Sequence, residues 1–62
     1  MNQMMEYKGY YGDAVYLPDD HIYHGKLQNI EAYVDYSGES ISELEVSFHE
    51  AVEDYLAFIE EF

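Results

Sequence analysis

A run of histidine and aspartate near the middle of the chain holds the residues best suited to chemistry. Asp19 and Asp20 precede His21, and His24 follows three positions later. Both residue types are ligands of zinc. Side chains three positions apart on a strand point to opposite faces, however, so the two histidines cannot easily share one ion. We interpret the run as polar turn and strand residues, and we expect neither a metal site nor a cofactor.

Paired carboxylates are the second candidate for chemistry. At helical spacing they are Glu39 with Glu43, and Glu50 with Glu53 and Asp54. Such pairs can bind a divalent ion or share a proton, but on a helix they more often form a solvated face, where like charges four positions apart are mildly destabilising. His49 lies among them, and the sequence assigns it no neighbour of the kind that a general base needs. We expect His49 on the surface or at the edge of an interface.

The rest of the chain does not predict catalysis. Asp13, Glu31 and Asp35 are acids on expected strands, but no pattern brings them into one cleft. The sequence has no cysteine, no phosphate-binding glycine loop and no nucleophile elbow. An acid-dependent nuclease is therefore the least favoured function, and we expect a protein that is not an enzyme.

Charge limits the choice of partner. The 62 residues include 14 acids and two lysines, which gives a formal net charge of -12. Nucleic-acid binding needs Lys and Arg to neutralise phosphates, and base stacking on the eight tyrosines would also need a basic groove. A basic protein is the natural complement of an acidic surface. The alternative is that the acidity only maintains solubility.

The size of the chain predicts a single domain, residues 1–62, of marginal stability. A chain of this length buries only about 60% of its unfolded surface. With no cysteine for a disulfide, oligomerisation or a partner is the remaining source of burial. No segment approaches the ~20 apolar residues of a membrane span, and the first residues do not have the pattern of a signal peptide. We expect a cytoplasmic protein that forms a dimer or larger oligomer and does not contact a membrane.

Three strands and one helix are the elements expected to position these side chains. Residues 10–17 are rich in Tyr and Val, and a proline-aspartate turn signal follows at residues 18–20. Residues 21–27 are predicted as the returning strand, and residues 30–36 as a third strand after a turn at residues 28–29. We therefore predict an α+β fold: an antiparallel meander of three strands, with or without a short extra strand, and a C-terminal amphipathic helix packed across it.

Alternation assigns the strand residues to two faces. One face takes Ala14, Tyr16, Tyr23, Gly25, Leu27, Val34 and Tyr36, and the other takes Asp13, Val15, Leu17, Ile22, His24 and Lys26. Apolar side chains on the second face would be exposed, which predicts a further layer, a subunit interface or a partner. A register slip of one residue would exchange the two faces. Gly25 within a strand predicts that another element packs closely there.

The helix is predicted by its cap and its apolar stripe. Ser40 and Glu43 match a capping box. Apolar residues then recur three or four positions apart, at Ile41, Leu44, Phe48, Val52, Tyr55, Ile59 and Phe62. At the other end, Glu60 and Glu61 add negative charge where the helix dipole is already negative, and no glycine cap follows. This end favours a helix that continues in a longer parent chain over a last turn that frays.

Three segments in a fixed order carry a resemblance to a known family. They are Tyr7-Lys8-Gly9-Tyr10 with Gly12, then Tyr23-His24-Gly25-Lys26, then a helical segment with Gly38, Leu44, Phe48, Val52, Asp54 and Tyr55. In order and spacing they resemble the HicB-type antitoxins of bacterial and archaeal toxin–antitoxin systems. The resemblance spans nearly the whole chain and implies a partial RNase H-like fold.

The resemblance also implies a function. The N-terminal domain of HicB-type antitoxins binds a small basic toxin of the HicA type, an RNA-cleaving protein, and covers its active site. A separate DNA-binding domain usually follows in that family. This sequence contains no such domain, so the resemblance implies no direct contact with nucleic acid. It implies no nuclease activity either, because no convergent set of acids is recognisable.

We expect the toxin to contact a mixed apolar and acidic surface. The apolar and tyrosine candidates are Tyr10, Tyr11, Val15, Leu17 and Ile22, and the acids at the rim are Asp13, Asp19, Asp20 and Glu53. Opposite charge would speed the encounter, and apolar contacts would sustain the complex. The alternative is a stand-alone oligomeric adaptor or interaction protein that keeps a HicB-like fold without a toxin partner.

Overall fold

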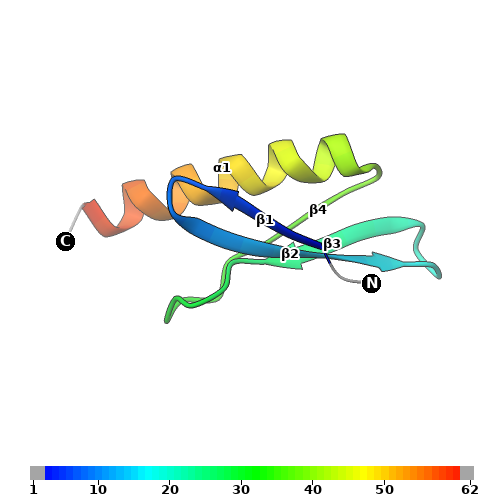
Figure 1. Cartoon of the computed structure of the whole chain (residues 1–62), viewed down its shortest axis with the longest axis horizontal. Helices are drawn as coiled ribbons and strands as arrows, with labels where there is room; N and C mark the ends of the chain where they lie inside the picture. Colours follow the sequence, from blue (N-terminus) through cyan, green and yellow to red (C-terminus); the bar gives the residue numbers. More distant parts are fainter. Residues whose placement is uncertain (1–2, 61–62) are drawn as a thin grey trace.

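Four antiparallel strands and one long helix form the domain, seen in a computed structural model that describes residues 3–60 (Figure 1). The elements are β1 (Gln3–Tyr7), β2 (Tyr10–Leu17), β3 (Ile22–Lys26), β4 (Asp35–Gly38) and α1 (Ile41–Glu60). The strands follow one another in the sheet in the order β1-β2-β3-β4. The predicted α+β class is confirmed, and the sheet has the additional strand that the sequence left open.

The β1–β2 hairpin contributes this fourth strand. Its register runs from Gln3 opposite Ala14 to Tyr7 opposite Tyr10, so only two residues connect the strands. Lys8 and Gly9 both have positive φ, 53° and 84°, which is the conformation that a two-residue hairpin turn requires. Glycine adopts this conformation without steric cost.

The predicted boundaries agree with β2 and the turn after it, and they are wrong for the last strand. β2 matches the predicted residues 10–17, and the turn after it is closed by a 3.2 Å bond from the Asp20 amide to the Leu17 carbonyl. The strand predicted at residues 30–36 is instead β4, which begins only at Asp35. The Leu27 amide donates to the Val34 carbonyl (2.9 Å) and the Gln28 amide to the Tyr11 carbonyl (2.8 Å). These bonds close residues 28–33 into a loop, so the chain does not turn back directly at residues 28–29.

The helix begins at the predicted cap. The Glu43 amide donates to the Ser40 hydroxyl at 3.2 Å, which satisfies one of the donors that a helix leaves unpaired at its start. The middle of the predicted stripe, Leu44, Phe48 and Val52, is fully buried. Its ends are not, because Ile41 and Ile59 are 37% and 39% exposed. The last predicted stripe residue, Phe62, lies outside the described residues.

Tyr36 and Phe48 form the centre of the core, above two glycines of the sheet. The Tyr36 and Phe48 rings lie 5.3 Å apart, and the Tyr36 hydroxyl donates to the Asp13 carbonyl at 2.8 Å. A methyl group at Gly25 would collide with the Asp13 carbonyl and come within 2.8 Å of the Tyr36 ring. The predicted close packing at Gly25 is confirmed, and Gly12 is crowded by the same two rings.

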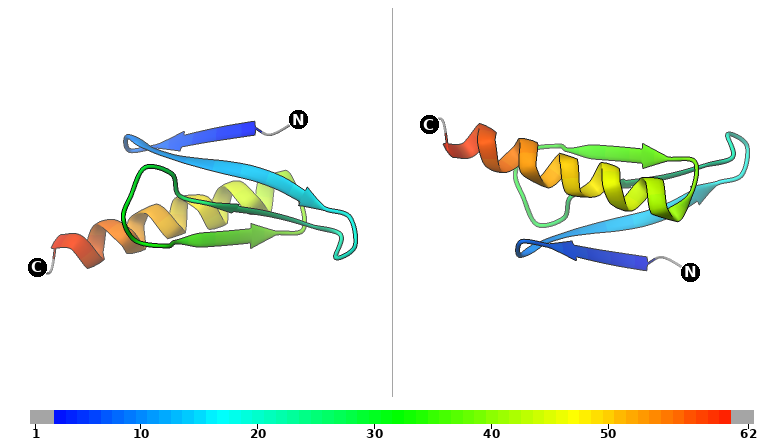
Figure 2. Two further views of the ribbon diagram at one scale, coloured as in Figure 1. Left: turned by 90° about the horizontal axis from the view of Figure 1, so that it is seen from below. Right: turned by 90° about the horizontal axis from the view of Figure 1, so that it is seen from above.

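Helix α1 covers only one face of the sheet (Figure 2). The strand register places Tyr16 opposite Tyr23 and Tyr36 opposite Gly25, on the helix side, while Val15 lies opposite His24 on the other side. The two predicted faces are therefore confirmed. The β2–β3 hairpin extends past the start of the helix, which gives the molecule an elongated shape of 39 × 17 × 17 Å (Figure 1). Within the described residues, α1 is too polar to cross a membrane.

Candidate protein-binding surface

The face of the sheet opposite α1, here called the open face, carries exposed apolar side chains. Strand alternation and the observed register assign to it Met4, Tyr11, Val15, Leu17 and Ile22, together with Glu6, Asp13, His24, Lys26, Asp35 and Ser37. Met4 and Tyr11 are 58% and 44% exposed, whereas the apolar residues nearer the β2–β3 turn are half-buried. Leu17 and Ile22 are directly opposite each other and form an apolar pair at the end of the hairpin. These apolar residues form a stretch that Asp13 interrupts between Tyr11 and Val15, and exposed apolar stretches are typical of a contact surface.

The polar groups of the open face hold one another in place. The Asp13 carboxylate accepts a hydrogen bond from the Lys26 amide at 2.9 Å, across β2 and β3. His24 Nε2 lies 3.2 Å from Asp35 Oδ2, a contact that becomes an ion pair when the imidazole is protonated. The Lys26 ammonium lies 5.7 Å from the centre of the Tyr33 ring. These contacts fix the acids beside the apolar stretch without neutralising the excess of negative charge.

The structure brings most of the predicted contact residues together. Asp13, Val15, Leu17 and Ile22 share the open face, as their alternation predicted, and Tyr11 lies on the same face. Asp19 and Asp20 are exposed in the turn that follows Leu17, so two carboxylates stand beside the Leu17–Ile22 pair. The result is an apolar patch with acids at one end and along its middle.

Two of the predicted contact residues lie elsewhere. Tyr10 is on the helix side of β2, where its ring meets the Tyr55 ring edge-on at a centroid distance of 5.6 Å. Tyr10 is thus part of the packing beneath the helix, because its even position in β2 faces the opposite way from Tyr11. Glu53 lies on α1, on the far side of the sheet from the open face.

Glu53 instead connects the helix to the β1–β2 turn. Its Oε2 atom accepts a hydrogen bond from the Tyr7 hydroxyl at 2.7 Å and lies 2.9 Å from the Lys8 ammonium. The Lys8 ammonium, followed by the Tyr7 hydroxyl, lowers the pKa of the Glu53 carboxyl, and the bond to Glu53 raises the pKa of Tyr7. His49 is exposed, as predicted, and stacks on the Tyr7 ring at 4.1 Å. No local pattern predicts this cluster, because Tyr7 and Glu53 are 46 positions apart in the sequence.

Residues 3–60 contain no group of three or more His, Cys, Asp or Glu side chains arranged to hold a metal ion. His21 lies in the turn, where its Nδ1 atom is 3.4 Å from the Tyr16 hydroxyl, and His24 contacts Asp35 on the open face. The two histidines thus have different partners.

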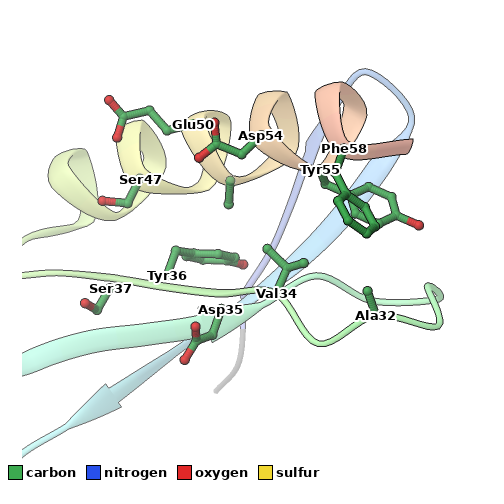
Figure 3. A pocket seen from close by; sticks show the side chains of 11 residues that line it. Ala32, Val34, Asp35, Tyr36, Ser37, Ser47, Glu50, Asp54, Tyr55 and Phe58 are labelled. Carbon is green, nitrogen blue, oxygen red and sulfur yellow. The ribbon is translucent and has the colours of Figure 1, made fainter. Parts of the chain in front are cut away.

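A groove of about 570 Å³ lies between α1 and the segment that leads into β4 (Figure 3). It is lined by Ala32, Val34, Asp35, Tyr36, Ser37, Ser47, Glu50, Ala51, Asp54, Tyr55 and Phe58. The groove could not be predicted from local patterns, because it forms only where residues 32–37 lie beside residues 47–58 of α1. Alternation along a strand predicts which residues share a face, but it does not predict which segment lies beside the helix.

The open face contains residues of all four strands of the described sheet, and the groove lies between helix α1 and the chain at β4. Across known protein families, curated proteins and solved structures, the chain has no match.

Proposed function

We propose that this chain is an antitoxin-like protein, which binds a small basic RNA-cleaving toxin of the HicA type and neutralises it by covering its active site. The observation that carries the proposal is the open face, an uncovered apolar sheet surface with acids beside it, on a chain of net charge -12. In this role the protein acts in the cytoplasm and contacts neither nucleic acid nor a membrane. The partial RNase H-like architecture belongs to the same proposal.

Electrostatic attraction supplies the first step of the proposed binding. A toxin that holds RNA phosphates presents a basic surface, and complementary charge raises association rates above those of a neutral pair. Asp19 and Asp20 are exposed at the tip of the β2–β3 hairpin, where an approaching partner meets them early. The encounter is therefore expected to slow as salt is added, because exposed charges are screened.

Apolar contacts on the open face supply the lasting part of the affinity. Buried aromatic and aliphatic anchors dominate the energetics of most interfaces. Tyr11 offers a large exposed ring, and the Leu17–Ile22 pair offers an aliphatic surface on a hydrogen-bonded hairpin. Because regular strands hold these side chains, little ordering is required when the partner binds.

The proposal predicts a neighbouring reading frame that encodes a small basic protein, and titration with that protein is the test. We expect a complex with a micromolar or lower dissociation constant at low salt, measured by calorimetry, and inhibition of RNA cleavage in the same mixture. The double variant Leu17→Thr/Ile22→Thr should weaken binding about tenfold or more. Val46→Thr is the matched control, since Val46 is 58% exposed on the helix and away from the open face. Absence of a complex at micromolar concentrations and low salt would contradict the proposal.

The uncovered apolar face also favours a second candidate, an oligomeric adaptor without a toxin. Two copies could cover the apolar stretch of the open face against each other, in place of a partner. Sedimentation of the isolated protein distinguishes the two cases. A dimer that is lost in Leu17→Thr/Ile22→Thr, together with no binding to the neighbouring basic protein, would favour the adaptor.

A further inference from the structure

The groove beside β4 runs along the edge of the sheet. Val34 and Tyr36 point toward the helix side of the sheet, whereas Asp35 and Ser37 belong to the open face, yet all four line the groove. Successive residues of a strand point to opposite faces, so they can line one groove only where it follows the strand edge. The backbone of β4 therefore forms one wall of the groove, and helix α1 forms the other (Figure 3).

The edge of β4 is available for pairing. In the described sheet β4 pairs with β3 on one side, and no strand of residues 3–60 lies on its other side. An edge strand presents a row of backbone N–H and C=O groups that can form hydrogen bonds with an added extended segment. At ~3.3 Å per residue, the four residues of β4 offer an edge of ~13 Å.

The helical wall of the groove is acidic. Glu50 and Asp54 lie one turn apart on α1, and Asp35 lies on the strand side. No Lys, Arg or His lines the groove. Glu50 and Asp54 form no ion pair or hydrogen bond within the described part of the chain, and like charges four positions apart repel each other. A cation placed between them would relieve this repulsion.

One end of the groove is apolar. Val34, Tyr55 and Phe58 line this end of the groove (Figure 3), and Phe58 is 54% exposed. Ala32 extends this end along the loop. The groove thus combines a free strand edge, two carboxylates and an aromatic end, which are the three elements needed to recognise a peptide by its backbone, its charge and one apolar side chain.

We propose that this groove binds an extended, lysine- or arginine-bearing segment of a protein partner, which adds to β4 as a fifth strand. The basic side chain lies against Glu50 and Asp54, and an apolar side chain of the segment lies against Tyr55 and Phe58. A second copy of this chain is a poor occupant, because pairing of two β4 edges would bring the Glu50 and Asp54 carboxylates of both copies together. The inference goes beyond the proposed function, since it does not use the apolar side chains of the open face.

Peptide binding to the full chain tests the inference. The probe is a capped nonapeptide that alternates lysine and valine, titrated into the isotopically labelled protein and followed by NMR. We expect the largest amide shift changes in residues 34–37, because these residues form the new hydrogen bonds. A peptide that alternates glutamate and valine should not bind, and a lysine-valine peptide N-methylated at every second residue should bind at least tenfold more weakly.

Variants separate the groove from the open face. Glu50→Gln/Asp54→Asn should weaken peptide binding about fivefold, in line with exposed charge pairs, and Leu17→Thr/Ile22→Thr should leave it unchanged. Shift changes that gather around Tyr11, Leu17 and Ile22, or equal binding of the N-methylated peptide, would overturn the inference. Peptide-independent dimerisation through β4 in sedimentation would also overturn it. None of these results bears on the titration with the basic toxin, so the two proposals fail separately.

Discussion

The two faces of the sheet carry similar apolar residues, but these residues differ in burial between the faces. On the helix side, Leu44, Phe48 and Val52 are fully buried, and the Phe48 ring packs closely over Gly12. On the open face, Leu17 and Ile22 are equally apolar but are only half-buried, with nothing above them in the described structure. Composition therefore does not distinguish the core from the open face in this protein. What separates them is which face receives the helix.

Loss of the Phe48 ring should have the largest effect on stability. Phe48→Ala removes a fully buried aromatic side chain that contacts Tyr36, and it should lower the free energy of unfolding by about 3–5 kcal/mol. Urea denaturation followed by circular dichroism measures the change. If the variant does not fold, Phe48→Leu should still show a loss of about 1–1.5 kcal/mol. Val46→Ala on the exposed side of α1 should change the free energy of unfolding by no more than about 0.5 kcal/mol. Equal losses at Phe48 and Val46 would show that the helix side is not the core.

Filling the space at Gly25 should have the next largest effect. Gly25→Ala places a methyl group against the Asp13 carbonyl and the Tyr36 ring, which should cost about 2–3 kcal/mol. Gly9→Ala is the informative control, since no atom lies within 4 Å of its added methyl group and only its positive φ of 84° opposes the change. We expect a loss of about 1 kcal/mol there. A Gly25→Ala variant more stable than Gly9→Ala would show that the helix side tolerates added volume.

Tyr36 should make stability dependent on alkaline pH. Burial, and then the nearby Asp13 carboxylate, raises the pKa of the Tyr36 hydroxyl well above its usual value. Above pH 10 the unfolded chain releases this proton while the folded protein keeps it, so the free energy of unfolding should fall, by up to about 1.4 kcal/mol per pH unit. Below pH 10 this contribution stays constant.

The variant Tyr36→Phe tests whether Tyr36 causes the loss of stability at alkaline pH. The variant loses the bond to the Asp13 carbonyl, at a cost of about 1 kcal/mol near neutral pH, and should show a shallower decline above pH 10. The decline that remains belongs in part to Tyr7, because its hydroxyl bonds to Glu53 and its pKa is also raised. Identical slopes in the two proteins, measured by denaturation at several pH values, would exclude Tyr36 as the cause.

The smallest effect on stability is expected on the open face. Leu17→Thr and Ile22→Thr keep residues that favour strands and should each cost about 0.5 kcal/mol, the scale of one cross-strand pair. The same variants should have the largest effect on partner binding. If they destabilise the isolated protein as much as Phe48→Ala does, the open face is part of the core of an oligomer, and sedimentation should then show that oligomer dissociating.

Local patterns explain why much of the fold and part of the candidate surface could be predicted. The β2 strand, the turn after it and the Ser40 cap each depend on residues close in sequence. The apolar side of the open face followed from alternation, which correctly separated Val15 from Ala14 and Leu17 from Tyr16. Tyr10 and Tyr11 were both named as contact candidates, although neighbours on a strand face opposite ways, and Tyr10 packs against Tyr55 beneath the helix.

Contacts between distant segments account for the rest. The predicted strand at residues 30–36 was wrong because the Leu27 and Gln28 amides find partners at Val34 and Tyr11. Glu53 was assigned to a contact rim, but the β1–β2 turn brings Lys8 and Tyr7 to it. The sequence by itself determined the period of each element, its caps and the net charge, because these depend on local spacing and composition. Only the tertiary structure decided which face the helix covers and that a groove opens beside β4, because both depend on how separate elements pack.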